Sequence, residues 1–287
     1  MFRKTVCLVV VAVLVFGIVG VTNEGETTLE EARRTGIIRV GFNNVAPWAY
    51  VEPKGALAGA SVDIAMTIFE RIGIDNAIAV IVPWSALIPS LKAKRFDAIT
   101  AGMYIKPERC AEVIFSEPTL STGWGLIVSY GNPLEIHSVD DLINNSNIRV
   151  ASPPGGYEWQ DLVRLGFPES RMVFVDGPPE GIAAIEAGRA DAYLANDLTC
   201  ADQASKHPGV ELATPWTDPV LDGKSVRGYA GTAFHKDDGD LRDAYNEELS
   251  RLKETGELLE IIAVYGLTEL NLPGDKTTAE LCGGESE

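Results

Sequence analysis

An aromatic residue and an arginine lie close together in the stretch TAGMYIKPERCAEVIFSEP, residues 100–118. Tyr104 precedes Arg109 by five positions, and the strand-like run FDAIT comes directly before the stretch. A guanidinium is planar and can bind both oxygens of a carboxylate, so Arg109 at the end of a buried strand suits a carboxylate site. The alternative is a surface ion pair between Arg109 and Glu108 or Glu112.

Three aromatic residues are predicted to follow strands of one sheet: Trp48, Trp84 and Tyr104. Because parallel strands end at the same edge, these rings should converge there, and Tyr157 could close from a second unit. Several rings around one point form a cage for a cation, worth about 0.5–2 kcal/mol per ring. The alternative is that the rings belong to the core, which is the favoured interpretation for Trp124, Trp159 and Trp216.

The segment SPPGGYEWQ places two glycines just before a predicted helix. Free backbone N–H groups and the positive end of the helix dipole occur at such a position. Gly155, Gly156 and Tyr157 could therefore bind the same carboxylate from the other side. The alternative is an ordinary glycine-containing turn between strand and helix.

Alternating strands and helices must position these residues. The first part of the chain reads βαβαβ, which predicts a mostly parallel sheet covered by helices. We expect Ser61 to cap the first of these helices, Gly73 to end it and Pro89 to bend the second. The ranges are strands at 37–42, 77–83 and 96–102 and helices at 61–73 and 84–95.

The α/β pattern restarts near residue 125 and continues to residue 214. A long amphipathic helix over 240–266 then needs a sheet face to cover, and the simplest packing returns it to the first unit. The chain would cross between lobes near 126–131 and 226–233, with a ligand cleft between the lobes. The expected division is a signal peptide at 1–22, lobe 1 at 30–127 plus 230–270, lobe 2 at 128–229 and a C-terminal tail at 271–287.

The N-terminus and the composition limit the function. Two cations followed by an apolar run to about Val21 predict a secretory signal peptide and hence a periplasmic protein, with a retained membrane anchor as the alternative. A net charge of -17 argues against a nucleic-acid partner. No Cys or His spacing predicts a metal site, and no cofactor is expected. Export would leave Cys110, Cys200 and Cys282, which allow at most one disulfide whose pairing stays open.

Three segments together resemble the family 3 solute-binding proteins of ABC importers. They are VGFNNVAPWAYVEPKGALAGASVDIA, FDAITAGMYIKPERCAEVIFSEP and LRDAYNEELSRLKETGELLEIIAVYG. Within the family, AGMYIKPERC, AGA at 58–60 and the PWSALIPSL segment are most similar to ectoine and hydroxyectoine binders. The resemblance covers roughly residues 30–270. It implies a two-lobe α/β fold of the second periplasmic-binding-protein type, a membrane permease as partner, a monomer and no catalysis.

The implied ligand is a small zwitterion, with its carboxylate on Arg109 and its cationic end in the aromatic cage. The sequence departs from the ectoine binders at Val45, where the resemblance implies a glutamate that accepts N–H bonds from the ligand. Leaving such a donor unpaired would cost about 1–3 kcal/mol. The residues that could substitute are Asn44, Glu158, Asn196 and Asp197.

The departure at Val45 leaves alternatives open. A methylated betaine has no N–H to satisfy and is the second choice, and a polar amino acid is the third. Asn196 stands where amino-acid binders carry an aspartate for the α-ammonium, which argues against ordinary amino acids. An exported dehydratase acting on prephenate-like acids would need a positioned acid, and Glu158 is the one evident candidate. A receptor's ligand-sensing domain would need a signalling or membrane segment after the long helix.

Overall fold

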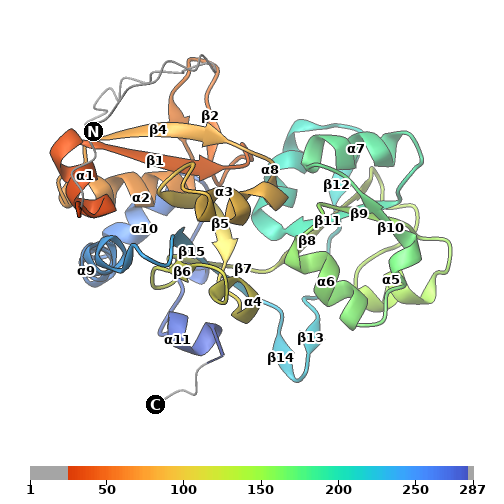
Figure 1. The fold of residues 1–287 in the computed structure, drawn as a ribbon. Coiled ribbons are helices and arrows are strands. Elements are labelled where there is room, and N and C mark those ends of the chain that lie inside the picture. The colour runs from red at the N-terminus through yellow and green to blue at the C-terminus, as the bar shows by residue number, and fades with distance from the viewer. Residues whose placement is uncertain (1–24, 284–287) are drawn as a thin grey trace.

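The computed structural model describes residues 25–283 and consists of two α/β lobes side by side (Figure 1). Lobe 1 surrounds a sheet with strand order β4-β1-β5-β15-β6, to which β7 adds by pairing with β15. Lobe 2 surrounds a sheet with order β10-β9-β11-β8-β12. The α/β architecture predicted from the alternating pattern is confirmed.

Lobe 1 is built from two separate parts of the chain. Its first part comprises α1 (Thr28–Thr35), β1 (Ile37–Phe42), β2 (Tyr50–Val51), β3 (Leu57–Ala58), α2 (Ala60–Arg71), β4 (Asn76–Ile81), the 3-10 turn η1 (Trp84–Ala86), α3 (Leu87–Lys92), β5 (Ala98–Tyr104), α4 (Pro107–Cys110), β6 (Ile114–Phe115) and β7 (Leu120–Thr122). Its second part comprises β15 (Gly228–Phe234), α9 (Gly239–Thr255), α10 (Glu257–Ala263), η3 (Glu269–Asn271) and α11 (Thr278–Leu281).

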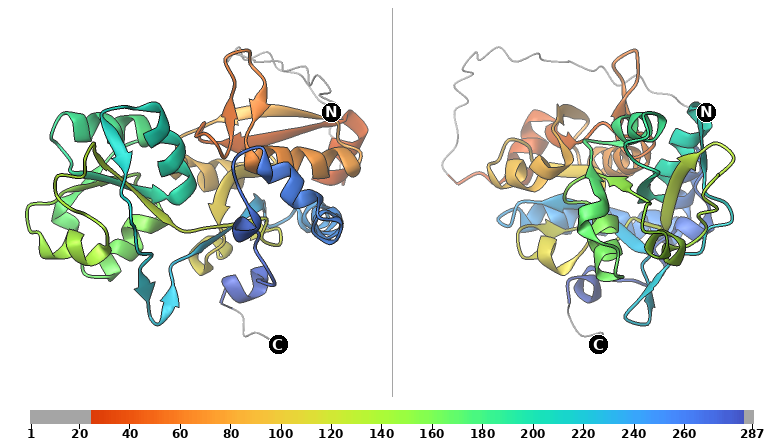
Figure 2. Two further views of the ribbon diagram at one scale, coloured as in Figure 1. Left: turned by 180° about the vertical axis from the view of Figure 1, so that it is seen from behind. Right: turned by 90° about the vertical axis from the view of Figure 1, so that its right-hand side faces the viewer.

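Lobe 2 lies between these two parts in the sequence. Its elements are β8 (Trp124–Ser129), α5 (Val139–Asn144), β9 (Val150–Ser152), α6 (Tyr157–Arg164), η2 (Glu169–Arg171), β10 (Met172–Phe174), α7 (Pro178–Glu186), β11 (Ala192–Asn196), α8 (Asp197–Lys206) and β12 (Val210–Leu212). The hairpin β13 (Val220–Leu221) and β14 (Lys224–Ser225) follows and projects beside the junction between the lobes (Figure 2).

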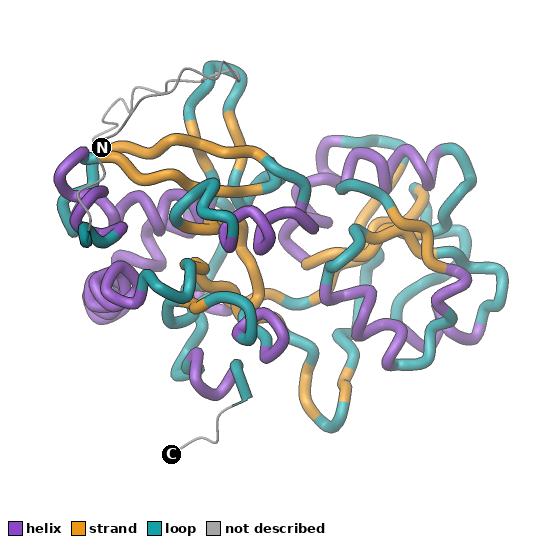
Figure 3. Tube along the Cα trace, in the orientation of Figure 1, coloured by secondary structure: helices purple, strands orange, loops and turns teal. Residues whose placement is uncertain are grey.

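Helices cover both faces of each sheet (Figure 3). Successive side chains of a strand point to opposite faces, so each strand can pack against helices on both sides. In β5, Ile99, Ala101 and Met103 pack in one apolar cluster with α3. Ala98 and Tyr104 pack on the opposite face, in the cluster that includes the buried side chains of α2, α9 and α10. The C-terminal helices therefore cover lobe 1, because their apolar faces have a sheet surface to bury.

Two connections join the lobes. The first lies at Gly123, between β7 and β8, and the second joins β14 to β15. The first connection precedes the interval 126–131 expected from the sequence by three residues, since β8 already begins at Trp124. The C-terminal ends of β1, β4 and β5 lie opposite lobe 2, since residues at or just after them line one pocket with residues of lobe 2.

Three local features differ from the sequence prediction. The cap of α2 is Gly59, and Ser61 lies within the helix with its hydroxyl buried and unpaired. The long C-terminal helix is interrupted at Gly256, whose φ of 81° is a left-handed conformation that glycine adopts without strain. Pro89 does not break α3, because it falls in the first turn, where no N–H partner is lost.

Candidate functional site

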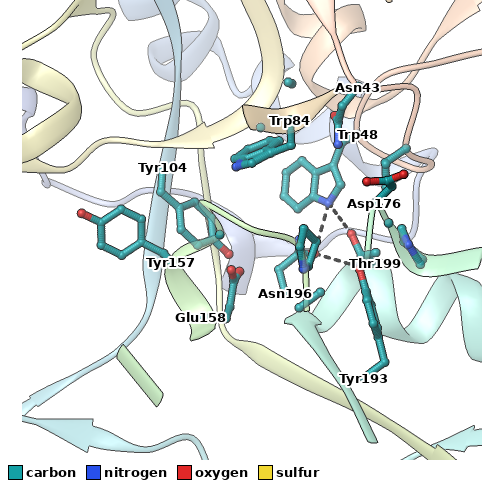
Figure 4. A pocket seen from close by; sticks show the side chains of 18 of the residues that line it. Asn43, Trp48, Trp84, Tyr104, Tyr157, Glu158, Asp176, Tyr193, Asn196 and Thr199 are labelled. Carbon is teal, nitrogen blue, oxygen red and sulfur yellow. Dashed lines mark hydrogen bonds between the residues drawn. The ribbon is translucent and has the colours of Figure 1, made fainter. Parts of the chain in front are cut away.

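A pocket lies between the two lobes, at the C-terminal ends of the lobe 1 strands (Figure 4). The cavity has a volume of about 80 Å³, several times what one water molecule needs. The pocket is lined by Asn43, Val45, Trp48, Trp84, Ala101, Gly102, Tyr104, Arg109, Pro153, Gly156, Tyr157, Glu158, Asp176, Gly177, Pro178, Tyr193, Ala195, Asn196 and Thr199. Among the residues proposed from the sequence to contact the ligand, Asn44, Gly155 and Asp197 are outside this lining.

Lobe 1 contributes three aromatic walls. Trp48 follows β1, Trp84 follows β4, and Tyr104 is the last residue of β5 rather than part of the loop after it. Glycines provide room for two of these rings. A Cβ atom at Gly102 would lie 2.6 Å from the indole of Trp48, and one at Gly228 would lie 2.2 Å from the ring of Tyr104. Neither glycine can therefore be enlarged without moving an aromatic wall.

Trp48 also connects the lobes. Its Nε1 donates to Asn196 Oδ1 at 3.1 Å and to Thr199 Oγ1 at 2.9 Å, both at the start of α8 in lobe 2. The side chain is only 3% exposed. Trp48 is thus a pocket wall and a core residue at once, and its indole N–H is used in holding the lobes together.

Arg109 projects from α4 and is 8% exposed. Nη1 donates to the backbone oxygen of Tyr104 at 2.9 Å, and Nη2 donates to the backbone oxygen of Gly155 in lobe 2 at 3.2 Å. Its Cζ lies 4.8 Å from the ring centroid of Tyr157 and 5.4 Å from that of Trp84. The guanidinium is therefore held between two rings and two carbonyls at the floor of the pocket.

The alternative of a surface ion pair does not fit this geometry. Among residues 25–283, Arg109 belongs to no ion pair with an N–O distance of 4.0 Å or less, and Glu112 pairs with Lys92. Glu108 instead accepts a hydrogen bond from the hydroxyl of Tyr157. Burial lowers the pKa of Arg109, and the nearby Tyr157, Glu158, Tyr104 and Glu108 partly oppose that shift.

The two glycines before α6 act differently from the expectation. Gly156 is the N-cap of α6, but its N–H donates to the backbone oxygen of Pro153 at 3.2 Å. Gly155 presents its carbonyl rather than its N–H, accepting from Arg109 and, at 3.3 Å, from Trp84 Nε1. This turn therefore supplies an acceptor that positions Arg109 rather than two donors for a carboxylate.

Glu158 is a carboxylate inside the pocket. It is the second residue of α6, is 9% exposed, and points into the pocket in Figure 4. It belongs to no ion pair within 4.0 Å among the described residues. Burial raises the pKa of Glu158, and its own backbone N–H, Arg109 and Lys106 partly oppose that shift. The pocket thus contains one buried cation and one buried anion that do not neutralise each other by direct contact.

The other possible substitutes for a glutamate at Val45 are engaged elsewhere. Asn44 lies outside the pocket lining and accepts from the N–H of Val51 at 2.9 Å. Asn196 lines the pocket, but its Oδ1 already accepts from the indole of Trp48 and, at 2.8 Å, from the N–H of Thr199. Of these possible substitutes, Glu158 is the one whose carboxylate lines the pocket with free acceptor capacity, and the exposed Asp176 brings a second carboxylate to the lining.

Asp197 is not brought to the pocket. Its two oxygens turn back to accept from the N–H of Gly123 at 3.0 Å and of Leu198 at 2.7 Å. Burial raises the pKa of Asp197, and these two donors oppose the shift. Asp197 does not face the pocket because both of its oxygens are used by backbone N–H groups, one at the connection between the lobes and one in the first turn of α8.

Four pocket residues with polar side chains were missed by the sequence reasoning: Asn43, Asp176, Tyr193 and Thr199. Asn43 directly follows β1, and Asp176 is the second residue after β10. The rule that residues after strand ends face the cleft, which found Trp48, could therefore have found both. Thr199 lies three residues after Asn196, on the same side of the start of α8. Tyr193 lies within β11 and gave no signal.

No group of three or more His, Cys, Asp or Glu side chains in the described part of the chain is arranged to hold a metal. None of the helices between residues 25 and 283 is long and apolar enough to cross a bilayer. The expected signal peptide lies outside the described residues.

Comparison with known families agrees with this geometry. The model of the bacterial extracellular solute-binding proteins, family 3, matches residues 38–268. The chain belongs to this family. A probable amino-acid ABC transporter periplasmic-binding protein from Sinorhizobium fredii is 39% identical over 262 residues, covering 90% of this chain and 87% of that protein.

Two solved structures are informative about the pocket. EhuB in complex with hydroxyectoine is 36% identical, with a TM-score of 0.80, over 91% of this chain and 99% of that one. The ancestral amino-acid-binding protein AncCDT-1, described as a precursor of cyclohexadienyl dehydratase, is 25% identical, with a TM-score of 0.72, over 83% and 99%. Both have the two-lobe fold, and the resemblance predicted from the sequence is confirmed.

Proposed function

We propose that this family 3 protein binds a small zwitterionic compatible solute of the ectoine and hydroxyectoine type and delivers it to an ABC permease. The observation that carries the proposal is the pair of buried, mutually unpaired charges, Arg109 and Glu158, in one aromatic pocket. A zwitterion supplies the missing partner of each. A buried charge is stable in a protein only when it is paired or hydrogen-bonded.

Arg109 would bind the ligand carboxylate. Two of its five N–H donors are used on backbone carbonyls, which fix the direction of the guanidinium and leave other donors for a ligand. The rings of Trp84 and Tyr157 restrict the guanidinium further. Such preorganisation lowers the entropy lost when the ligand is bound.

The cationic end of the ligand would lie against Trp48, Trp84 and Tyr104 and donate to Glu158. In this assignment Glu158 replaces the glutamate that the resemblance implies at Val45. An N–H donor gains a charge-assisted hydrogen bond from Glu158, whereas a quaternary ammonium gains only Coulomb attraction. We therefore rank a cyclic amidinium first, and the hydroxyectoine bound to EhuB supports this order.

A methylated betaine stays the second candidate and a polar amino acid the third. The name of the Sinorhizobium fredii relative supports the amino-acid alternative. We propose further that the protein acts as a monomer in the periplasm, exported through the signal peptide at residues 1–22. Closure of the lobes over the ligand would be a hinge motion at the two connections.

A catalytic role is the alternative of another class. The pocket contains a buried carboxyl group, Glu158, whose pKa is raised by burial, as a general acid requires. Two observations favour binding: the family consists of solute-binding proteins, and AncCDT-1 is described as an amino-acid-binding precursor of an enzyme. Incubation with prephenate and spectrophotometric detection of the product would test the alternative directly.

A thermal-shift screen tests the ligand. Ectoine, hydroxyectoine, glycine betaine, proline betaine, choline and the common amino acids would be added to the mature protein. A ligand at about 100 times its Kd adds about 2.7 kcal/mol, equivalent to about 5–10 °C in Tm for a protein of this size. Choline lacks a carboxylate and serves as the control for Arg109.

Each outcome of the screen has a defined meaning. A shift with the ectoines alone supports the assignment of Glu158. A shift with betaines alone contradicts it and means that Val45 marks a change of ligand. A shift with choline equal to that with glycine betaine contradicts the carboxylate role of Arg109.

A further inference from the structure

The short helix α4 makes the contacts of lobe 1 with α6 of lobe 2. Besides Arg109, which bonds to the turn before α6, the hydroxyl of Tyr157 donates to Glu108. Lys106, the N-cap of α4, lies 4.2 Å from the ring centroid of Tyr157 and 3.6 Å from a carboxylate oxygen of Asp161. The segment around α4 therefore contains both Arg109, the proposed carboxylate-binding group, and two further residues, Lys106 and Glu108, that contact lobe 2.

This helix is too short to maintain its own position. It spans four residues, Pro107–Cys110, and an isolated helical turn is unfavourable because nucleation fixes several dihedral angles for few hydrogen bonds. Its backbone bonds run within the segment, from the N–H groups of Cys110, Ala111 and Val113 to residues 106, 107 and 109. Contacts from elsewhere must hold α4 against the sheet.

The C-terminus supplies such a contact. We define the C-terminal anchor as residues 277–283 together with the disulfide between Cys110 and Cys282. The disulfide joins the last residue of α4 to the residue after α11, across a sequence separation of 172. A Cβ atom at Gly283 would lie 3.9 Å from the ring of Pro107, so the anchor also covers the first residue of α4.

The anchor is itself attached to lobe 1. Thr278 Oγ1 donates to the backbone oxygen of Ser116 at 2.6 Å, and the N–H of Thr278 donates to Glu117 at 3.0 Å. Leu281 and Cys282 pack against the apolar cluster beneath β5. The anchor therefore links α4 to the segment directly after β6 and to the core of lobe 1.

From this arrangement we infer that the C-terminal anchor is a positioning device for Arg109. It holds α4 in the orientation in which the guanidinium faces the pocket and the closing contacts with α6 form. Ligand affinity then depends on a disulfide that does not touch the ligand. The inference rests on the proposed function only for the choice of ligand, since the position of α4 can be measured without one.

The experiment compares the wild type with a Cys110→Ala/Cys282→Ala variant. Hydrogen exchange by mass spectrometry would follow the peptide covering residues 105–113 in the ligand-free protein, and calorimetry would give the Kd for ectoine. Leu258→Ala, in the buried face of α10, is the control for general loss of stability in the same lobe. All measurements would be made well below the melting temperature of each variant.

We expect exchange in 105–113 to become at least tenfold faster in the disulfide variant, with lobe 2 peptides unchanged, and the Kd for ectoine to rise about tenfold. In Leu258→Ala, acceleration should not be concentrated in 105–113. In an Arg109→Lys background, removing the disulfide should weaken binding by less than threefold, because the group that the anchor positions has already been altered.

Unchanged exchange in 105–113 would overturn the inference whatever ectoine does. Acceleration spread evenly over lobe 1, as in Leu258→Ala, would also overturn it, since the disulfide would then act only on overall stability. If ectoine does not bind the wild type, the ligand assignment fails, and the exchange measurement alone decides the role of the anchor.

Discussion

Replacing Glu158 with glutamine removes one negative charge from the pocket at nearly constant shape. The carboxylate is 9% exposed and has no cationic partner within 4.0 Å among the described residues. If it accepts an N–H from a cationic ligand, the lost interaction is a hydrogen bond between charged groups, worth about 1.5–3 kcal/mol. We therefore expect the Kd for ectoine to rise about 10- to 150-fold.

The same substitution should act in the opposite direction on the ligand-free protein. Burial raises the pKa of Glu158 in the folded state, so the folded protein binds a proton more readily than the unfolded chain does. Stability therefore falls as the pH rises through the window between the unfolded and folded pKa values. Above that window the buried charge is destabilising, and Glu158→Gln should leave the Tm at neutral pH unchanged or higher.

The pH dependence of binding gives a second measurement. A cationic ligand requires the ionised form of Glu158, so wild-type affinity should fall as the pH is lowered through the raised pKa. Glu158→Gln should remove this dependence. Calorimetric titrations at about pH 7.5 and about pH 5, for both proteins, would measure it.

Asp197→Asn is the matched control for this substitution. Asp197 is a partly buried carboxylate in the same lobe, with its pKa also raised by burial, but its oxygens face the N–H groups of Gly123 and Leu198. Asparagine has one acceptor oxygen where the carboxylate has two, so in Asp197→Asn one of these N–H groups would face an NH2 group. The Tm should therefore fall, unlike that of Glu158→Gln, and the Kd should stay within about threefold. An affinity in Glu158→Gln within twofold of the wild type would refute the reasoning, and a larger loss in Asp197→Asn would place the acceptor there.

Three further predictions concern the remaining walls of the pocket. Arg109→Ala should abolish detectable calorimetric binding, and unchanged affinity would remove the carboxylate assignment. Trp48→Ala and Trp84→Ala should each weaken binding at least tenfold by titration while the protein stays folded by circular dichroism; if neither does, the aromatic cage is wrong. Gly102→Ala should weaken binding at least tenfold and lower the Tm more than the control Gly36→Ala does. Both glycines have a left-handed φ, 66° at Gly102 and 68° at Gly36, but only at Gly102 would a Cβ atom meet an indole. Equal effects of the two substitutions would mean that backbone strain alone is responsible.

Much of the fold follows from periodicity. The strand at 37–42 and the helix beginning near residue 60 were predictable because their apolar residues recur at the spacing of each element. The pocket walls Trp48 and Trp84 were predictable for a related reason: parallel strands share one edge, so residues that follow them converge. Neither inference requires knowledge of side-chain directions.

What could not be predicted depends on those directions. Glu158 and Asp197 both stand in the first turn of a helix near the cleft, yet Glu158 faces the pocket, whereas the oxygens of Asp197 accept from the N–H groups of Gly123 and Leu198. Three cysteines allowed three pairings, and the choice of Cys110 with Cys282 depends on where a C-terminal segment docks. The room made by Gly102 for the indole of Trp48 is likewise visible only in three dimensions.

Under the proposed role of Glu158, these directions also explain how the pocket would keep its chemistry with a valine at position 45. A glutamate on the lobe 1 loop would bring the anion to the ligand from the side that carries the rings. Glu158 instead belongs to α6, whose first residue contacts Glu108 and Arg109 of lobe 1. The carboxylate of Glu158 would then join the binding site only when the lobes meet, so ligand recognition and closure would be the same event. A donor-rich cation would favour the closed state more strongly than a methylated one, because differential affinity alone can shift such an equilibrium.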